Sequence, residues 1–266
     1  MLLLTLLGCT AEDVTAFDSS WQEVWSDEFD GSAGSPPDAA NWTHDVGGDG
    51  WGNEQLEYNT DRTENAALSG DSTLVITARE EDYEGNAYTS ARLKSQDLFE
   101  PEYGRIEARI KLPQGQGLWP AFWLLGADFE EVGWPVCGEI DILEMRGDSP
   151  EQVHGTIHGA GYYGGGGLGG TYALDEGTFA DDFHTFTVDY EPERLAWYVD
   201  GVPYLTLSPG DLPGGSAWSH DGAVFLILNL AVGGNYLGNP DDSTAFPASL
   251  EVDWVKVWER AGGYPE

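Results

Sequence analysis

Short apolar runs separated by turn residues dominate the pattern along the chain. Between residues 104 and 112, apolar residues alternate strictly with charged ones, which is the period of a strand with one buried face and one wet face. Between residues 197 and 207, two apolar runs flank Asp200 and Gly201, and an Asp-Gly pair favours a tight hairpin turn. Both segments therefore predict antiparallel strands.

The rest of the chain repeats this pattern, and no long helical period is present. We predict further strands at residues 74–78, 89–94, 121–125, 139–145, 183–190, 224–231 and 250–258. The glycine run 164–170 is predicted to be a loop, because it lacks the lysine and the following helix of a phosphate-binding loop. The expected fold is all-β, a sandwich of two antiparallel sheets in one domain at residues 21–260.

Charge excludes several classes of partner. The chain of 266 residues has 47 acidic and 11 basic residues, a net charge of -36, which repels nucleic acid and anionic lipid headgroups. The carboxylates are scattered along the chain, so we interpret them as a solvated surface. Because salt screens repulsion of this kind, the composition favours life at high salt.

The first residues resemble an export signal. Residues 2–7 are apolar and too few to cross a bilayer, and the following Gly8-Cys9 resembles a lipoprotein cleavage box. We expect a signal at residues 1–8, a linker at 9–20, a tail at 261–266, and a secreted or extracellular protein anchored to the cell surface by lipid on Cys9. Cys137 would then be the one cysteine besides Cys9, so no intramolecular disulfide is expected.

The segment 139–145 places three carboxylates among branched apolar residues. On a regular strand Glu139 and Asp141 share a face, whereas Glu144 points to the opposite one. A β-bulge near Ile142 and Leu143 would return Glu144 to the face of the other two. We therefore predict a bulged strand that presents all three acids together.

Two neighbouring carboxyls fit the chemistry of glycoside hydrolysis. Retaining glycosidases need them about 5–5.5 Å apart, one as nucleophile and one as acid. Their like charges raise the pKa of one member, which keeps that group protonated. From the residues alone, a metal site and a solvated acidic edge stay open as alternatives.

Several stretches resemble glycoside hydrolase family 16: residues 25–29 (WSDEF), 103–109 (YGRIEAR) and 118–125 (LWPAFWLL), followed by the acidic motif. The spacing of two residues between Asp141 and Glu144 resembles that of the laminarinases in this family. The resemblance implies a β-jelly roll with an open substrate cleft and retaining endo-hydrolysis of β-1,3-glucan without a catalytic cofactor. It also implies Glu139 as nucleophile, Glu144 as acid/base and Asp141 as the assisting residue.

The same resemblance implies a set of substrate-binding residues: Asn53, Arg92, Trp119, Trp123, Trp134 and His158. Indole faces suit the C–H faces of sugar rings, although Trp123 suits a sandwich core equally well. His154 and His158 lack a third ligand at zinc spacing, so zinc is not expected. The sequence departs from the family in the order of Gln55 and Glu57, and in Tyr236, which stands where an indole is common.

The family resemblance also implies a structural calcium on the convex face, held by Glu28, Gly70 and Asp253, because oxygen ligands suit that cation. The expected partner is a β-glucan polysaccharide, and the expected state is a monomer. Mixed-linkage β-glucan and agar stay open as alternative substrates, while polysulfated carrageenan is disfavoured by the acidic chain. A non-catalytic glucan-binding lectin on the same fold is the alternative from another class.

Overall fold

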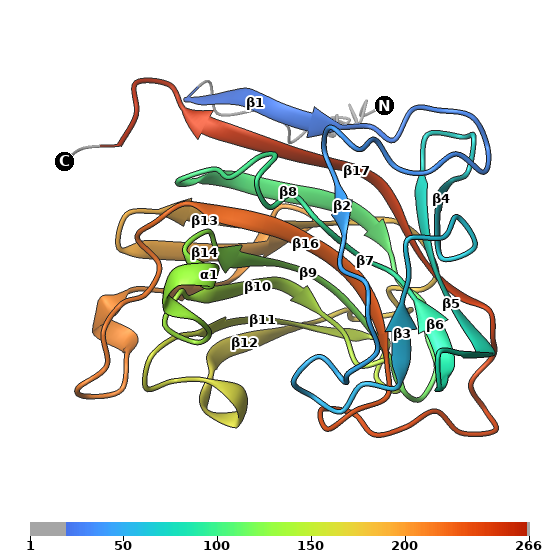
Figure 1. Ribbon diagram of the computed structural model, residues 1–266. Helices are drawn as coiled ribbons and strands as arrows, with labels where there is room; N and C mark the ends of the chain where they lie inside the picture. Colours follow the sequence, from blue (N-terminus) through green and yellow to red (C-terminus); the bar gives the residue numbers. More distant parts are fainter. Residues whose placement is uncertain (1–19, 265–266) are drawn as a thin grey trace, which may run out of the picture.

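The structure is a computed structural model that describes residues 20–264. It is a sandwich of two β-sheets, as predicted, with both sheets running across the molecule in Figure 1. The predicted signal, nearly all of the predicted linker and Cys9 lie outside the described residues. Among the described strand pairs, all are antiparallel except β3 (Glu57–Asn59) with β6 (Asn86–Ser90), which is parallel.

The larger sheet has ten strands in the order β15-β14-β13-β8-β17-β5-β6-β3, with β1 paired to β17 and β4 paired to β5. Its other strands are β1 (Trp21–Asp27), β4 (Ala66–Leu68), β5 (Leu74–Tyr83), β8 (Gly104–Lys111), β13 (His184–Glu191), β14 (Arg194–Val199), β15 (Val202–Leu207) and β17 (Ala248–Arg260).

The smaller sheet has seven strands in the order β12-β11-β10-β9-β16-β7-β2. They are β2 (Thr43–His44), β7 (Arg92–Lys94), β9 (Leu118–Gly126), β10 (Glu139–Glu144), β11 (Gln152–His158), β12 (Leu168–Ala173) and β16 (Val224–Val232). The face of this sheet that is turned away from the larger sheet carries the acidic motif, and we call it the site face.

The main core lies between the two sheets and forms one continuous apolar cluster. Strand β8 alternates between buried and half-buried residues along its whole length, which confirms the pattern predicted for residues 104–112. The hairpin is also confirmed: β14 pairs with β15, Val199 lies opposite Val202, and both turn residues, Asp200 and Gly201, have positive φ. The strand patterns therefore determine which residues form the core.

Two predicted segments differ from the structure. Residues 89–94 were expected to form one strand, but the chain passes from β6 in the larger sheet to β7 in the smaller one at Ala91, which is fully buried. The glycine run 164–170 is only partly a loop, because β12 begins at Leu168. A side chain at Gly169 would meet the carbonyl oxygen of Gly155 at 2.3 Å, so glycine lets β12 pair closely with β11.

Residues 20–264 contain little helix. The four-residue α1 (Phe129–Val132) belongs to the connection between β9 and β10, and the 3-10 turns η1 (Gly164–Gly166) and η2 (Pro209–Asp211) lie in other connections. A second, smaller apolar cluster on the site face contains Leu125, Cys137, Phe225 and Ile227, with Trp123 and Phe129 packed against it. Within residues 20–264, no helix has the length and apolar character needed to cross a membrane.

Candidate active site

The predicted bulge is present in β10, and it decides where the acidic side chains point. On the neighbouring strand β9, Asp141 lies opposite Trp123 and Leu143 lies opposite Phe122, so Ile142 has no partner there. Ile142 and Leu143 are both buried in the main core. The extra residue therefore returns Glu144 to the site face, which it shares with Glu139 and Asp141.

The acidic row is closely surrounded by ring nitrogens. His158 Nε2 lies 3.6 Å from Glu139 Oε1 and 3.4 Å from Asp141 Oδ2. Trp119 donates its indole N–H to Glu144 Oε1 at 3.1 Å. His158 thus contacts the Glu139 end of the row, and Trp119 contacts the Glu144 end. Asp141, in the middle, is only 4% exposed.

Burial changes the protonation of these acids. Burial, and after it the charge of Asp141, raises the pKa of Glu144 to about 8. Burial, and after it Asp141, also raise the pKa of Glu139 to about 8. His158 lowers the pKa of both glutamates, and Arg92 lowers that of Glu139. The pKa of Asp141 itself is raised by burial. The acidic row therefore favours shared protons, and the charge of Arg92 favours an anion at Glu139.

Trp123 and Arg92 form the wall next to Asp141. Trp123 donates its indole N–H to the buried Asn229 at 2.8 Å, which fixes the plane of the ring. The guanidinium of Arg92 lies 4.6 Å from the Trp123 ring centroid and 5.1 Å from that of Trp51. Asp45 pairs with Arg92 at 2.9 Å. The guanidinium is therefore held by one carboxylate and by the rings of two tryptophans.

The segment that carries Asn53 is fixed to the end of β16. The carbonyl oxygen of Asn53 accepts a bond from Asn235 N–H at 2.8 Å, and Leu56 N–H donates to the Val232 carbonyl at 2.8 Å. Glu57 accepts a bond from Val232 N–H at 2.8 Å through one oxygen. Asn53 itself is exposed, so its side chain is open to a ligand.

Comparison with known proteins supports the reading of this geometry. The family model described as glycosyl hydrolases family 16 matches residues 51–256. This chain belongs to family 16. A curated relative, "Beta-glucanase" from Rhodothermus marinus, is 43% identical, and the match covers 97% of this chain and 92% of the relative.

Solved structures agree with this family assignment. The catalytic domain of an endo-1,3-beta-glucanase (laminarinase) from Thermotoga petrophila is 46% identical with a TM-score of 0.85, and covers 91% of this chain and 98% of that one. The endo-beta-1,3-glucanase from Pyrococcus furiosus is 44% identical with a TM-score of 0.84, covering 91% and 95%. The jelly-roll fold expected from the sequence is thereby confirmed.

Within this family 16 site, the structure brings most of the predicted residues together. Trp119 contacts the acidic row directly, Trp123 stands beside it with Arg92, and the Trp134 ring lies 6.3 Å from the His158 ring. Trp134 is 43% exposed, which is not how a core residue behaves. Trp123 was expected to suit either a sandwich core or the substrate site. Its ring packs against the small apolar cluster, and its indole N–H bond to Asn229 fixes the ring on the site face.

Sequence reasoning missed several supporting residues. Asp45 and Asn229 orient Arg92 and Trp123, and no local motif marks them. Glu57 was noticed only as a departure from the family 16 pattern, but it is fully buried. The sequence gives no signal for this burial, because Leu56 and Tyr58 alternate with Glu57 and Asn59, a pattern that predicts exposed polar residues.

The predicted calcium ligands do not fit a calcium site in this arrangement. Glu28 pairs with Lys256 at 2.6 Å, and Asp253 pairs with Arg109. Gly70 is the predicted backbone ligand, and a side chain there would meet Ala33 at 2.9 Å. Since basic side chains of this chain already neutralise both carboxylates, a cation would have to displace them.

His154 and His158 have different neighbours. His154 contacts Thr171 at 2.9 Å, whereas one ligand atom each of Glu139, Asp141 and His158 lies within 4.8 Å of the others. His158 therefore has two carboxylates near it, and His154 is not part of this group. Two of these groups belong to the acidic row, so an ion there would occupy the row itself.

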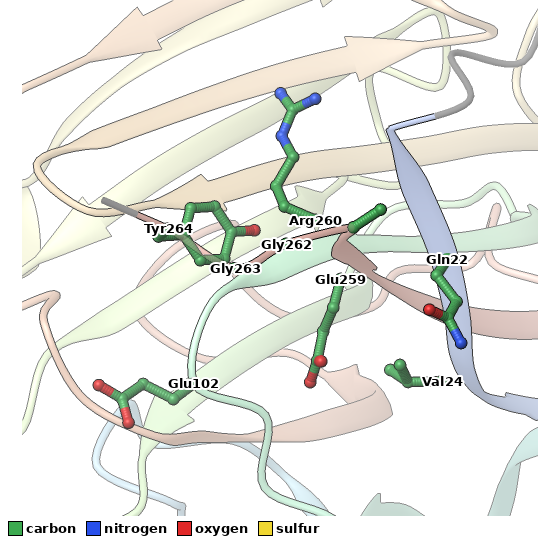
Figure 2. Close-up of a pocket in the computed structure, with 9 residues that line it drawn as sticks. Gln22, Val24, Glu102, Glu259, Arg260, Gly262, Gly263 and Tyr264 are labelled. Carbon is green, nitrogen blue, oxygen red and sulfur yellow. The ribbon is translucent and has the colours of Figure 1, made fainter. Parts of the chain in front are cut away.

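A separate hollow lies away from the acidic row. It has a volume of about 450 Å³ and sits between β1 and the segment that follows β17 (Figure 2). Glu102, Glu259 and Tyr264 line it, and Arg260 pairs with Glu191 at 2.8 Å. Because β1 and β17 belong to the larger sheet, this hollow is not part of the family 16 site.

Proposed function

We propose that the protein is a retaining endo-β-1,3-glucanase that cleaves laminarin-type glucans. The observation that carries the proposal is the bulge in β10, which places Glu139, Asp141 and Glu144 on one face. Membership of a family of glycosyl hydrolases supports it, as does the similarity to the endo-1,3-β-glucanases from Thermotoga petrophila and Pyrococcus furiosus.

In the first step, Glu139 acts as the nucleophile. One of its carboxylate oxygens attacks the anomeric carbon while the bond from that carbon to the glycosidic oxygen breaks. Glu144 gives its proton to the departing oxygen, and its raised pKa keeps that proton available at neutral pH. The result is a glycosyl ester on Glu139 and a shortened glucan that leaves with a new hydroxyl group.

In the second step, Glu144 acts as a base. It takes a proton from a water molecule, whose oxygen attacks the anomeric carbon and releases the Glu139 carboxylate. Asp141, between the two, orients Glu139 and shares the His158 contact. Two inversions at the same carbon retain the original configuration of the sugar.

The wall residues hold the sugar chain. Trp119, Trp123 and Trp134 offer ring faces for stacking, and Asn53, Arg92 and His158 offer hydrogen-bonding groups for hydroxyls. Trp119 has a second role, because its N–H bond to Glu144 fixes the acid/base in place. The protein needs no cofactor in this mechanism.

The proposal is tested by reducing-sugar release from laminarin, lichenan, agarose and carrageenan, with the anomeric configuration of the first products read by NMR. We expect cleavage of laminarin and products of retained configuration. Cleavage of agarose or lichenan alone would replace the proposed substrate. If laminarin is bound but not cleaved, the protein is a glucan-binding lectin and not an enzyme.

We propose further that the enzyme is exported as a monomer and is anchored to the cell surface through Cys9. The support is the apolar run that ends in Gly8-Cys9 and the polymeric nature of the substrate, which is met outside the cell. Mass spectrometry of the N-terminal peptide from the native source would detect a lipid on Cys9, and an unmodified cysteine would rule out the anchor.

A further inference from the structure

Two exposed aromatic side chains meet beside the acidic row. Trp134 precedes β10, and Tyr163 lies in the connection from β11 to β12. Their side chains are 43% and 52% exposed, and their ring centroids are 5.5 Å apart with the planes at 75°. Two rings at this angle form the walls of a corner that is open to solvent.

The structure fixes the direction of the Tyr163 side chain through its neighbour. Tyr162 is buried, forms a β-bridge with Gly159, and donates its hydroxyl to the Ala217 carbonyl at 3.2 Å. Tyr163 has extended backbone angles, φ -143 and ψ 167. Because successive side chains of an extended segment alternate in direction, anchoring Tyr162 inward sends Tyr163 outward.

The space in front of the corner is free of other side chains. Residues 164–166 are glycines, and a β-carbon built on any of them meets no atom within 4 Å. A backbone turn without side chains next to the two rings leaves room for a sugar ring. A loop of larger residues would fill this space.

The corner is continuous with the catalytic groups. The Trp134 ring lies 6.3 Å from the His158 ring, and His158 Nε2 lies 3.6 Å from Glu139. Neither ring carries a charge, and the neighbouring α1 contributes Glu130 and Glu131. Such surroundings favour a neutral sugar over a sulfated one.

We propose that Trp134 and Tyr163 form a further glucosyl subsite, which holds a unit of the glucan chain at least one unit away from the bond that is cleaved. Tyr163 is the specificity-determining residue of this subsite, because it supplies the second wall. The inference rests on the proposed function and adds to it a preference for longer chains.

The test compares Tyr163→Ala with wild type on β-1,3-glucose oligomers of increasing length and on laminarin. We expect kcat/KM to fall roughly threefold to tenfold on long chains, the usual range for one lost ring contact. Short oligomers that do not reach the corner should be cleaved at the wild-type rate. Tyr163→Phe keeps the ring and should behave like wild type, and Leu98→Ala removes an equally exposed apolar side chain elsewhere.

An equal loss at every length, or no loss at any length, would overturn the subsite. A binding experiment needs no turnover. Calorimetry measures the affinity for the same oligomers of Glu139→Gln and of the double variant that also carries Tyr163→Ala. If wild type cleaves no glucan, the proposed function fails, while the binding arm still decides the subsite. Weaker binding of long oligomers alone supports it, and unchanged binding contradicts it.

Discussion

Four carboxyl groups on or behind the site face hold their protons more strongly than ordinary acids. Three form the acidic row, and the fourth is Glu57, which lies behind the wall. For Glu144, a raised pKa serves the reaction directly, because a general acid must still be protonated near neutral pH. Glu57 touches no reacting atom, so its proton affects stability instead.

Replacing Glu57 with glutamine should change how stability depends on pH. Burial raises the pKa of Glu57 to about 8, against an ordinary value near 4.5. The folded state therefore binds this proton more tightly, and its contribution to stability is complete below about pH 4.5 and is lost as pH rises through 8. Glutamine keeps a carbonyl acceptor for Val232 N–H and does not ionise. The Tm of Glu57→Gln should rise relative to wild type between pH 5 and about 9.

A matched control is Glu64→Gln, since Glu64 is exposed. Its Tm should follow wild type across the whole pH range. A constant difference between Glu57→Gln and wild type, measured by calorimetry at each pH, would show that Glu57 does not carry a tightly held proton.

At the scale of the strand, the bulge in β10 allows a direct test by deletion. Ile142 has no partner on β9, so removing it should restore regular alternation and still direct Glu144 to the site face. Loss of a buried side chain should lower stability by about 2–5 kcal/mol. Reducing-sugar release at low temperature should nevertheless stay well above that of Glu144→Gln.

The opposite change provides the contrast. An alanine inserted between Leu143 and Glu144 moves the acid to the core face or forces a second bulge, so activity should fall to the level of Glu144→Gln. If the deletion variant folds, as judged by circular dichroism, yet is as inactive as Glu144→Gln, side-chain direction is not what the bulge provides.

Strands with one clear face were predictable, and sites built from distant segments were not. The bulge was predictable because, in this sequence, only an extra residue lets all three acids face the site while their apolar neighbours face the core. The passage from β6 to β7 was missed because Ala91 is apolar and continues the strand pattern. The Asp45–Arg92 pair and the Trp134–Tyr163 contact were missed because each joins loops or strands that only the fold brings together.

At the scale of the whole molecule, charge should dominate the response to salt. The net charge is -36, so the acidic groups repel one another in the folded state. Raising the salt concentration from about 0.01 M to about 1 M shortens the screening length from roughly 30 Å to roughly 3 Å. The Tm should therefore rise over this range of sodium chloride. A Tm that stays constant or falls would show that the carboxylates are already neutralised by other means.

The central claim is that Glu139 performs the covalent step of glucan hydrolysis. The most direct measurement is the initial rate of reducing-end release from laminarin by Glu139→Gln, beside wild type and Glu131→Gln, an exposed glutamate on α1. We predict that Glu139→Gln folds like wild type and loses activity by several orders of magnitude, while Glu131→Gln keeps it. A Glu139→Gln enzyme that turns over laminarin at the wild-type rate would contradict the account.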